Sequence, residues 1–292
     1  MIRKDIVNPQ MPAITQLHVY PVKSMRGISV DEAELTVRGL KYDRNWMVTD
    51  QTGRFITQRE LPKLASVTVS ISDGILQLSN ASGSTISVSP GSQPRKEIVT
   101  EVWGDRCEAL DEGDEISGWL TDSLGSLKGK SLRLVRFNDS FKRVVDPNYL
   151  KNEHSHTTFA DGFPFLITSE ESLAMLNDHL VQAGEYPVTM DRFRPNIVIK
   201  GLQPLRENEI DQMASADGSF VLGLRKPCKR CKVTTVDQES GEIHEPKEPL
   251  RTLTKMETVP GLHGAYFGQN ATLLKGEGEN VKIGDQLDVV RE

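Results

Sequence analysis

The sequence predicts a mainly β protein with a few helices, in the α+β class. Short runs of alternating apolar residues recur through the first hundred positions with tight turns between them, which is typical of antiparallel strands. Two segments further on carry apolar residues at helical spacing. The chain has no glycine-rich phosphate loop of the Walker or dinucleotide type, so the pattern favours a small sheet or barrel over a βαβ layer.

Size and charge narrow the class of protein. The 292 residues, 37% of them hydrophobic, can bury one large core or two modest ones. No apolar run approaches the ~20 residues that cross a bilayer, and residues 1–10 do not form a secretory signal. Three cysteines without an even framework suit a reducing compartment, so we expect a cytoplasmic protein without membrane contact. A net charge of -6 argues against a general nucleic-acid binder and makes any local positive charge informative.

The first predicted strand ends beside a candidate phosphate-binding pair. Ile14 to Tyr20 alternates as a strand does, and Pro21 breaks it just before Lys23 and Ser24. A lysine supplies a point charge and a hydroxyl supplies a hydrogen-bond donor, which together suit a phosphate oxygen; a solvated turn is the alternative interpretation.

An antiparallel meander follows. Alternation predicts strands at 35–37, 46–48, 67–71, 75–78, 86–88 and 98–102. Asp43 and Arg44 lie between the first two of these strands, and Asp73-Gly74 is one of the turns. We expect the last strand-like segment, 281–290, to close a barrel.

Two helices and a long loop are predicted in the middle of the chain. Asp114 is placed to cap a helix that buries Ile116, Trp119, Leu120 and Leu124. Ser169 is placed to cap a second helix that ends at Gly184 and whose N-terminus is a natural anion site. Between them, residues 138–161 are polar and aperiodic, which predicts a long surface loop whose histidines are exposed rather than metal ligands.

A stiff segment precedes a buried strand further on. Arg194, Pro195 and Asn196 lead into the apolar strand 197–199. Held rigidly, an arginine and an asparagine suit bidentate recognition of a phosphate or of a heterocycle edge. An ion pair between Arg194 and Asp191 is the alternative.

The segment 225–237 carries the strongest signal. It gathers Arg225, Lys226, Cys228, Lys229, Arg230, Cys231 and Lys232. Neighbouring cations favour the thiolate, which is the form that binds a metal or attacks a substrate. The alternation after residue 232 predicts a strand leaving the pair, so we expect both cysteines at the mouth of a sheet.

Four interpretations of the cysteine pair are open. A zinc site needs four ligands, and Cys107, His244 and His263 fit no finger spacing. A thioredoxin-like pair would need a helix after the second cysteine instead of β-branched residues. Two structural cysteines would leave the five cations unexplained. A thiolate bound to a metal within a larger anionic cofactor accounts for both the cysteines and the cations.

Taken together, these residues resemble the MOSC family, and in particular its subgroup that includes the mitochondrial amidoxime-reducing component and its bacterial relatives. The likeness runs from Ile14 to Val290 and is carried by Tyr20-Pro21-Val22-Lys23-Ser24, Asp43-Arg44, Phe193 to Ile199, Cys228 to Asp237, Lys247-Glu248-Pro249-Leu250 and Phe267-Gly268. The resemblance implies an N-terminal antiparallel β-barrel-like module, residues 12–110, and a MOSC β-barrel, residues 111–292. The two modules would grip a molybdenum cofactor, with the metal bound by the pterin dithiolene and one cysteine.

Carried onto this chain, the resemblance assigns the metal ligand to Cys231. The implied cofactor contacts are Lys23, Ser24, Arg44, Gly162, Phe163, Arg194, Asn196 and Arg230. Family members carry an acidic pair near the metal at a position where this chain reads Arg206-Glu207-Asn208-Glu209. We therefore expect Glu207 or Asn208 to face the metal, with Glu207 as the candidate proton donor.

The activity implied is reduction of N-hydroxylated compounds, such as hydroxylamines, amidoximes or N-hydroxylated bases, by oxygen-atom transfer to molybdenum. Some bacterial relatives append a ferredoxin domain, and this chain has no such cysteine cluster, so we expect a separate ferredoxin- or flavin-type electron donor. Two alternatives stay open: a non-catalytic cofactor carrier or sulfur-transfer module with a persulfide on Cys231, and a binding protein that has lost the chemistry.

Overall fold

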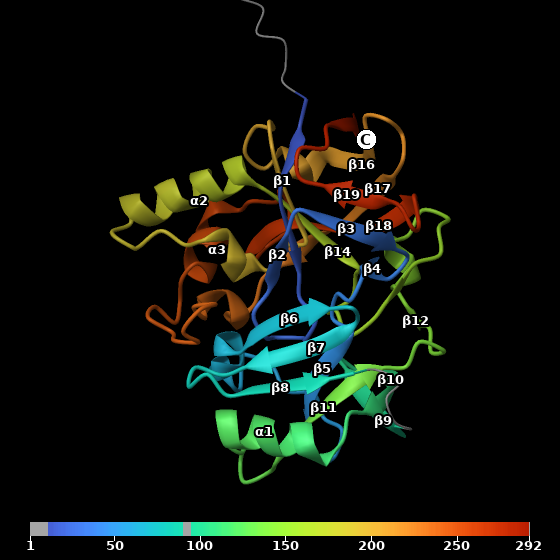
Figure 1. Ribbon diagram of the computed structural model, residues 1–292. Helices are drawn as coiled ribbons and strands as arrows, with labels where there is room; N and C mark the ends of the chain where they lie inside the picture. Colours follow the sequence, from blue (N-terminus) through green and yellow to red (C-terminus); the bar gives the residue numbers. More distant parts are fainter. Residues whose placement is uncertain (1–10, 90–94, 292) are drawn as a thin grey trace, which may run out of the picture.

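An eight-stranded sheet forms one half of the molecule in the computed structural model, which describes residues 11–89 and 95–291 (Figure 1). Its strands run in the order β2 (Ile28–Val30), β1 (Ala13–Val19), β15 (Ile197–Lys200), β14 (Phe165–Ser169), β18 (Tyr266–Lys275), β17 (Val221–Lys229), β16 (Ile210–Ser215) and β20 (Leu287–Arg291). The pair β14–β15 is parallel, and helix α2 (Glu170–Gln182) makes the connection between the two strands. Ser169 caps α2 as predicted, because its hydroxyl accepts a hydrogen bond of 3.1 Å from the Ser172 amide.

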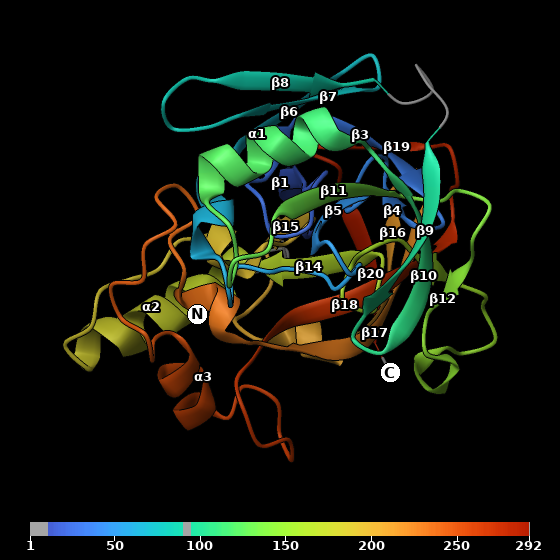
Figure 2. The same ribbon diagram turned by 90° about the horizontal axis from the view of Figure 1, so that it is seen from below.

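Smaller antiparallel sheets form the other half. One contains β5 (Trp46–Asp50), β11 (Leu132–Phe137), β10 (Asp105–Asp111) and β9 (Lys96–Val102), and another contains β6 (Thr68–Ser72), β7 (Ile75–Ser79) and β8 (Thr85–Val88). Helix α1 (Asp114–Leu124) packs Ile116, Leu120 and Leu124 into the core that these two sheets share (Figure 2). Gly113 occupies the cap position expected of Asp114, and the carboxylate of Asp114 lies in the first turn.

Short elements complete the fold. A three-stranded sheet contains β19 (Asn280–Lys282), β3 (Glu32–Thr36) and β4 (Gly39–Leu40), and a two-stranded one contains β12 (Arg143–Val144) and β13 (His156–Thr157). The predicted short helix near residue 250 is α3 (Leu250–Met256), and five 3-10 helices are described: η1 (Pro62–Ser66), η2 (Pro147–Tyr149), η3 (Met190–Phe193), η4 (Arg206–Glu209) and η5 (Lys232–Thr235). No helix in the described part of the chain is long and apolar enough to span a bilayer.

The mainly β, α+β prediction is confirmed, but these sheets are not closed barrels. The segment 281–290, expected to close one, divides between β19 and β20 at the turn around Gly284, whose φ is +95°. β20 is an edge strand paired with β16. The start of β1 meets residues 284–287 through the bridge between Ala13 and Gln286 and through backbone hydrogen bonds, among them one of 3.0 Å from the Ile14 amide to the Asp285 carbonyl.

Two local predictions are wrong. The second half of the predicted surface loop is interior, because Phe159 is fully buried and the Arg143 guanidinium holds the backbone carbonyls of Thr158 and Ala160. The strand expected directly after Cys231 is not formed, and η5 (Lys232–Thr235) occupies that place instead. The Thr234 hydroxyl donates to the Cys231 carbonyl at 2.9 Å, a local bond that competes with strand pairing.

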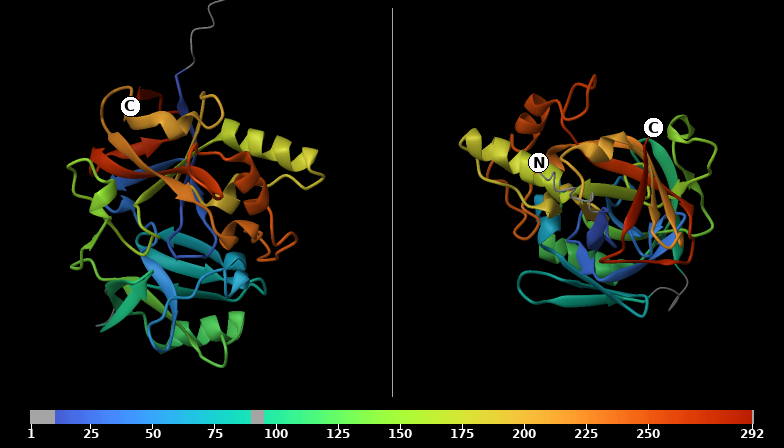
Figure 3. Two further views of the ribbon diagram at one scale, coloured as in Figure 1. Left: turned by 180° about the vertical axis from the view of Figure 1, so that it is seen from behind. Right: turned by 90° about the horizontal axis from the view of Figure 1, so that it is seen from above.

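The core of the large sheet draws on both ends of the chain. Leu17, Leu35 and Leu40 from the N-terminal strands pack with residues such as Leu222 and Val281 from the C-terminal third. In the sheet β1 lies between β2 and β15, and Figure 3 shows this half of the molecule from behind and from above. The N-terminal segment is therefore an integral part of the large sheet.

Candidate cofactor site

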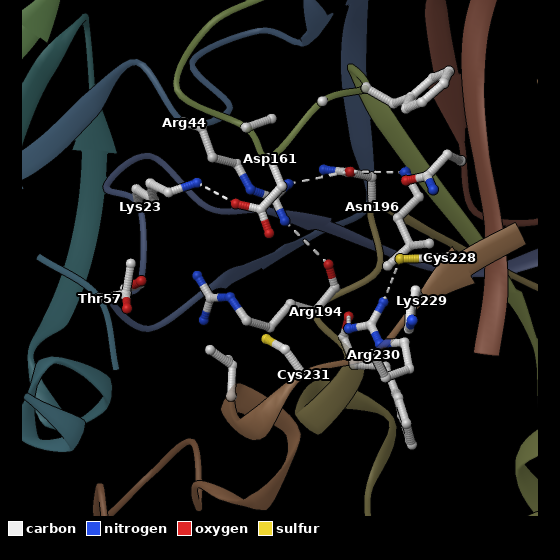
Figure 4. A pocket seen from close by; sticks show the side chains of 18 of the residues that line it. Lys23, Arg44, Thr57, Asp161, Arg194, Asn196, Cys228, Lys229, Arg230 and Cys231 are labelled. Atoms are coloured by element: carbon white, nitrogen blue, oxygen red, sulfur yellow. Dashed lines mark hydrogen bonds and ion pairs between the residues drawn. The ribbon is translucent and has the colours of Figure 1, made fainter. Parts of the chain in front are cut away.

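A pocket with an empty volume of about 830 Å³, its open mouth included, is lined by segments far apart in the sequence (Figure 4). Every residue that the sequence assigned to cofactor binding lines it, together with the predicted metal ligand: Lys23, Ser24, Arg44, Gly162, Phe163, Arg194, Asn196, Arg230 and Cys231. The N-terminal loops supply the first three, the entry into β14 the next two, and the η3–β15 and β17–η5 connections the rest.

The pocket is strongly cationic. Six cations line it, namely Lys23, Arg44, Arg59, Arg194, Lys229 and Arg230, against one carboxylate, that of Asp161. A chain of net charge -6 thus concentrates positive charge in one concavity, where a low-dielectric wall strengthens its effect on an anion. The site is built for a ligand with several negative charges.

Tyr20 orders two of these arginines. The guanidinium carbons of Arg44 and Arg194 each lie 4.3 Å from the centroid of its ring. The Tyr20 hydroxyl donates to the Pro195 carbonyl at 3.1 Å, and burial raises the pKa of this hydroxyl, so the ring stays neutral and fixed. Two like charges are therefore held against one buried aromatic ring.

Buried amides fix the same arginines in position. Asn196 accepts a hydrogen bond of 3.1 Å from Arg44 and donates to the His18 carbonyl at 3.2 Å. Gln238 accepts from Arg194 at 2.9 Å and is itself paired with Gln58 at 3.0 Å. Asn196 lines the pocket, and the hydrogen bond from its side chain holds Arg44 in position.

Two guanidinium groups that line the pocket have a buried donor without a partner among the described residues. The Arg194 Nη2 and the Arg230 Nε are both buried and make no hydrogen bond. Burial lowers the pKa of Arg194 to about 10, with Tyr20 opposing and Arg44 adding to the effect, so this side chain is still charged at neutral pH. An unsatisfied buried donor on a cation carries a desolvation cost that an anionic ligand would remove. The pocket thus fits a phosphorylated, anionic cofactor.

Asp161 is the pocket's internal counter-ion. Its carboxylate lies 2.5 Å from the Lys23 ammonium, which also donates to the Phe159 carbonyl at 2.7 Å. Burial lowers the pKa of Lys23, and Asp161 partly restores it. Because 71% of the Asp161 side chain is exposed, this carboxylate can be exchanged for a stronger anion.

The two cysteines of the motif differ in their surroundings. Arg230 Nη1 contacts the Cys228 sulfur at 2.8 Å, so that thiol already has a cationic partner. Cys231 is the N-cap residue of η5 and lines the pocket. None of the described residues makes a hydrogen bond to its sulfur, which points into the pocket in Figure 4. Among the described residues no group of three or more His, Cys, Asp or Glu could hold a metal, so a metal here would need ligands from a cofactor.

Three of the lining residues have left-handed backbone conformations. The φ angles of Ser24, Arg44 and Arg194 are +68°, +49° and +54°. Such conformations cost of order 1 kcal/mol or more in residues other than glycine and are concentrated at functional sites. They turn all three side chains into one pocket from separate loops.

Glu207 does not line this pocket, and the expectation that it faces a metal stays a prediction. Its side chain is buried under the first turn of α2 and accepts hydrogen bonds from the hydroxyls of Ser172 at 2.9 Å and Ser169 at 3.3 Å. Burial raises its pKa, and these bonds oppose the shift. Asn208 bonds to the Thr258 carbonyl and to Gln269, so neither candidate of this segment lines the site.

Sequence reasoning missed part of the lining. Thr57, Arg59, Asp161, Lys229 and Asn270 line the pocket without having been assigned to it. Arg59 and Lys229 stood near candidate motifs and could have been found from their charge. Asn270, within β18, gave no signal, because it reaches the site through the β17–β18 pairing.

Comparison with known families agrees with this geometry. Residues 11–127 match the MOSC N-terminal beta barrel domain and residues 154–288 match the MOSC domain. The chain belongs to the MOSC family. Its MOSC regions together contain every lining residue named above.

Curated relatives fall into two groups. The chain is 34% identical to mitochondrial amidoxime reducing component 2 of Rattus norvegicus, over 84% of this chain and 72% of that protein. It is 33% identical to mitochondrial amidoxime-reducing component 1 of Homo sapiens, over 95% and 83%. It is also 28% identical to the molybdenum cofactor sulfurase of Oryza sativa subsp. japonica, over 97% of this chain and 36% of that protein. The first two relatives are named as mitochondrial, so the cytoplasmic location stays a prediction.

Proposed function

We propose that this MOSC protein is a molybdenum-cofactor-dependent reductase of N-hydroxylated compounds, among them hydroxylamines, amidoximes and N-hydroxylated bases. The observation that carries the proposal is the pairing of a free, pocket-facing thiol, Cys231, with unsatisfied buried donors on Arg194 and Arg230. The relatives named for amidoxime reduction support the same class of reaction.

The proposed division of labour follows from the lining. Lys23 and Ser24 bind the cofactor phosphate, Arg44 and Arg194 hold the pterin end, and Cys231 supplies the thiolate ligand to molybdenum. When bound, the cofactor supplies a metal that accepts the substrate oxygen and cycles by two electrons. Per turnover, one N–O bond breaks, two electrons and two protons are consumed, and an amine and water leave.

A second candidate function is a cofactor carrier or sulfur-transfer module in which Cys231 bears a persulfide. The rice sulfurase supports it, because nearly the whole of this chain matches a third of that protein. The cationic pocket would then hold the cofactor without turning it over.

Metal analysis separates the two functions. The protein is purified from cells that make the cofactor, and molybdenum, cyanide-labile sulfur and reduction of benzamidoxime with reduced methyl viologen are measured together. About one molybdenum per chain with amidine formation supports the reductase. Labile sulfur on Cys231 without metal and without turnover would contradict it and favour the sulfur-transfer module.

A further inference from the structure

An exposed tryptophan lies at the rim of the pocket. Trp103, 46% exposed, donates its indole N–H to the Asp161 carboxylate at 2.9 Å. The guanidinium carbon of Arg59 lies 3.9 Å from its ring centroid, and the Phe55 ring meets it edge-on at 4.9 Å. Asp161 and Arg59 both line the pocket, so Trp103 directly contacts two lining residues from the outside.

A second exposed aromatic residue contacts a lining residue and a cation, as Trp103 does. Tyr149, 37% exposed, packs edge-on against Phe163, with ring centroids 6.1 Å apart. The Lys226 ammonium lies 3.9 Å from the Tyr149 ring centroid. Phe163 lines the pocket, so Tyr149 and Lys226 extend its rim outward.

The rim is positively charged and largely unneutralised. Lys229 lines the pocket and is exposed, and Lys232 is exposed between two lining residues, Cys231 and Val233. Within the part of the chain that the structure describes, no ion pair joins Arg59, Lys226, Lys229 or Lys232 to a carboxylate. Arg225, in the same run of cations, is by contrast paired with both Glu153 and Asp211, at 2.5 and 2.9 Å.

We propose that this rim, made of Arg59, Trp103, Tyr149, Lys226, Lys229 and Lys232, is the docking surface for an acidic electron-carrier protein. Exposed tryptophan, tyrosine and arginine are the residue types that anchor protein interfaces, and a positive rim steers a negatively charged partner into register. A carrier seated there lies over the pocket that would hold the metal, which shortens the path of electrons. The proposal rests on the proposed reductase function, since it names the chemistry of that enzyme's donor. For each substrate molecule, two one-electron carriers dock in turn, each is oxidised by one electron, and the two electrons pass to the cleavage of the N–O bond.

Charge reversal at two rim residues outside the pocket lining tests the proposal. The double variant Lys226→Glu/Lys232→Glu is compared with unsubstituted protein and with Lys275→Glu. Lys275 is also exposed, but it pairs with Val221 at the opposite end of the β17–β18 ladder, whereas Lys229 pairs with Tyr266. Tyr266 and Lys275 are nine residue steps apart along β18, which corresponds to about 30 Å.

Three measurements are made on the holoprotein. The first is the affinity for a plant-type ferredoxin of strongly negative charge at low and high salt. The second is reduction of benzamidoxime driven by that ferredoxin, and the third is the same reaction driven by methyl viologen. We expect the double variant to bind ferredoxin about 20-fold more weakly at low salt, an effect reduced to about twofold at 0.5 M salt. Ferredoxin-driven turnover should fall in parallel, while viologen-driven turnover and the Lys275→Glu protein should be unchanged.

Equal ferredoxin affinity in the double variant and the unsubstituted protein, with viologen-driven turnover intact, overturns the docking surface and leaves the reductase function standing. A loss in Lys275→Glu that is as large per reversed charge also overturns it, because the effect would then come from net charge alone; the double variant changes the net charge by −4 and Lys275→Glu changes it by −2. No viologen-driven turnover in the unsubstituted protein overturns the reductase function and the docking proposal together.

Discussion

Arg194→Met tests whether burying a cation in the pocket lowers the free energy of unfolding of the protein. The side chain is 8% exposed, and burial lowers its pKa from the ordinary value of an arginine to about 10. That drop corresponds to about 3 kcal/mol of destabilisation of the charged form. The sign follows from the direction of the shift. A base whose folded pKa is depressed destabilises the fold by the full amount at every pH below that pKa; the cost begins to fall only above about pH 10 and vanishes above the pKa of the unfolded state.

Replacing Arg194 with methionine removes the charge and keeps most of the side-chain volume. The loss of the hydrogen bond to Gln238 costs about 1 kcal/mol, and the left-handed backbone is equally strained in both proteins. We therefore expect the cofactor-free variant to gain about 1–2 kcal/mol in its free energy of unfolding. The same variant should bind pyrophosphate at least tenfold more weakly, because a charge-assisted hydrogen bond contributes about 1.5–3 kcal/mol.

Chemical denaturation and calorimetric titration with pyrophosphate measure both effects, and Arg192→Met is the matched control. Arg192 does not line the pocket; it pairs with Asp237 at 3.3 Å and donates to the Thr235 carbonyl at 3.0 Å. We expect the control to lose about 1 kcal/mol of stability and to bind pyrophosphate normally. If Arg194→Met were destabilised by more than about 2 kcal/mol with unchanged pyrophosphate affinity, Arg194 would be a structural residue and the reasoning would fail.

The remaining predictions concern the sulfur ligand and the acidic groups. Cys231→Ala should lose bound molybdenum and reduction of a hydroxylamine, while Cys228→Ala keeps much of both; an equal loss would refute the choice of ligand. Glu207→Gln should leave reduction unchanged. The stability of this variant relative to the parent protein should rise with pH, because a carboxyl with a raised folded pKa stabilises the fold at low pH and loses that contribution as the pH passes the folded pKa. Denaturation midpoints of both proteins from pH 4 to 8 measure this difference. Asp161→Asn should bind pyrophosphate several-fold more tightly, because the internal competitor for Lys23 is removed, and titration showing weaker binding would contradict the exchange of anions.

The sequence was most informative where chemistry is local. Cations beside Cys231, and the pairing of Lys23 with a hydroxyl at a strand end, are visible from composition and order alone, and these residues meet in one pocket. The cap of α2 was equally predictable, because a capping serine followed by two glutamates acts within one turn.

Long-range pairing was the harder part. No pattern in the sequence near Ala13 or Gln286 predicts that these two residues pair, although the arrangement of the large sheet depends on contacts of this kind. The place of Glu207 could not be predicted either, because a carboxyl beside a motif can accept hydrogen bonds at a helix end, as Glu207 does from Ser169 and Ser172, as readily as it can face a metal. The division of the chain at residue 110 stays a prediction; β10 and β11 pair across it.

The position of β1 inside the large sheet limits how this protein can be cut or recombined. A fragment beginning after α1 would lack the strand that lies between β2 and β15, and would expose the backbone edge of β15. Genetic exchange should therefore transfer the two matched regions only as an undivided block. The rice sulfurase has that arrangement, because 97% of this chain matches one stretch of that longer protein.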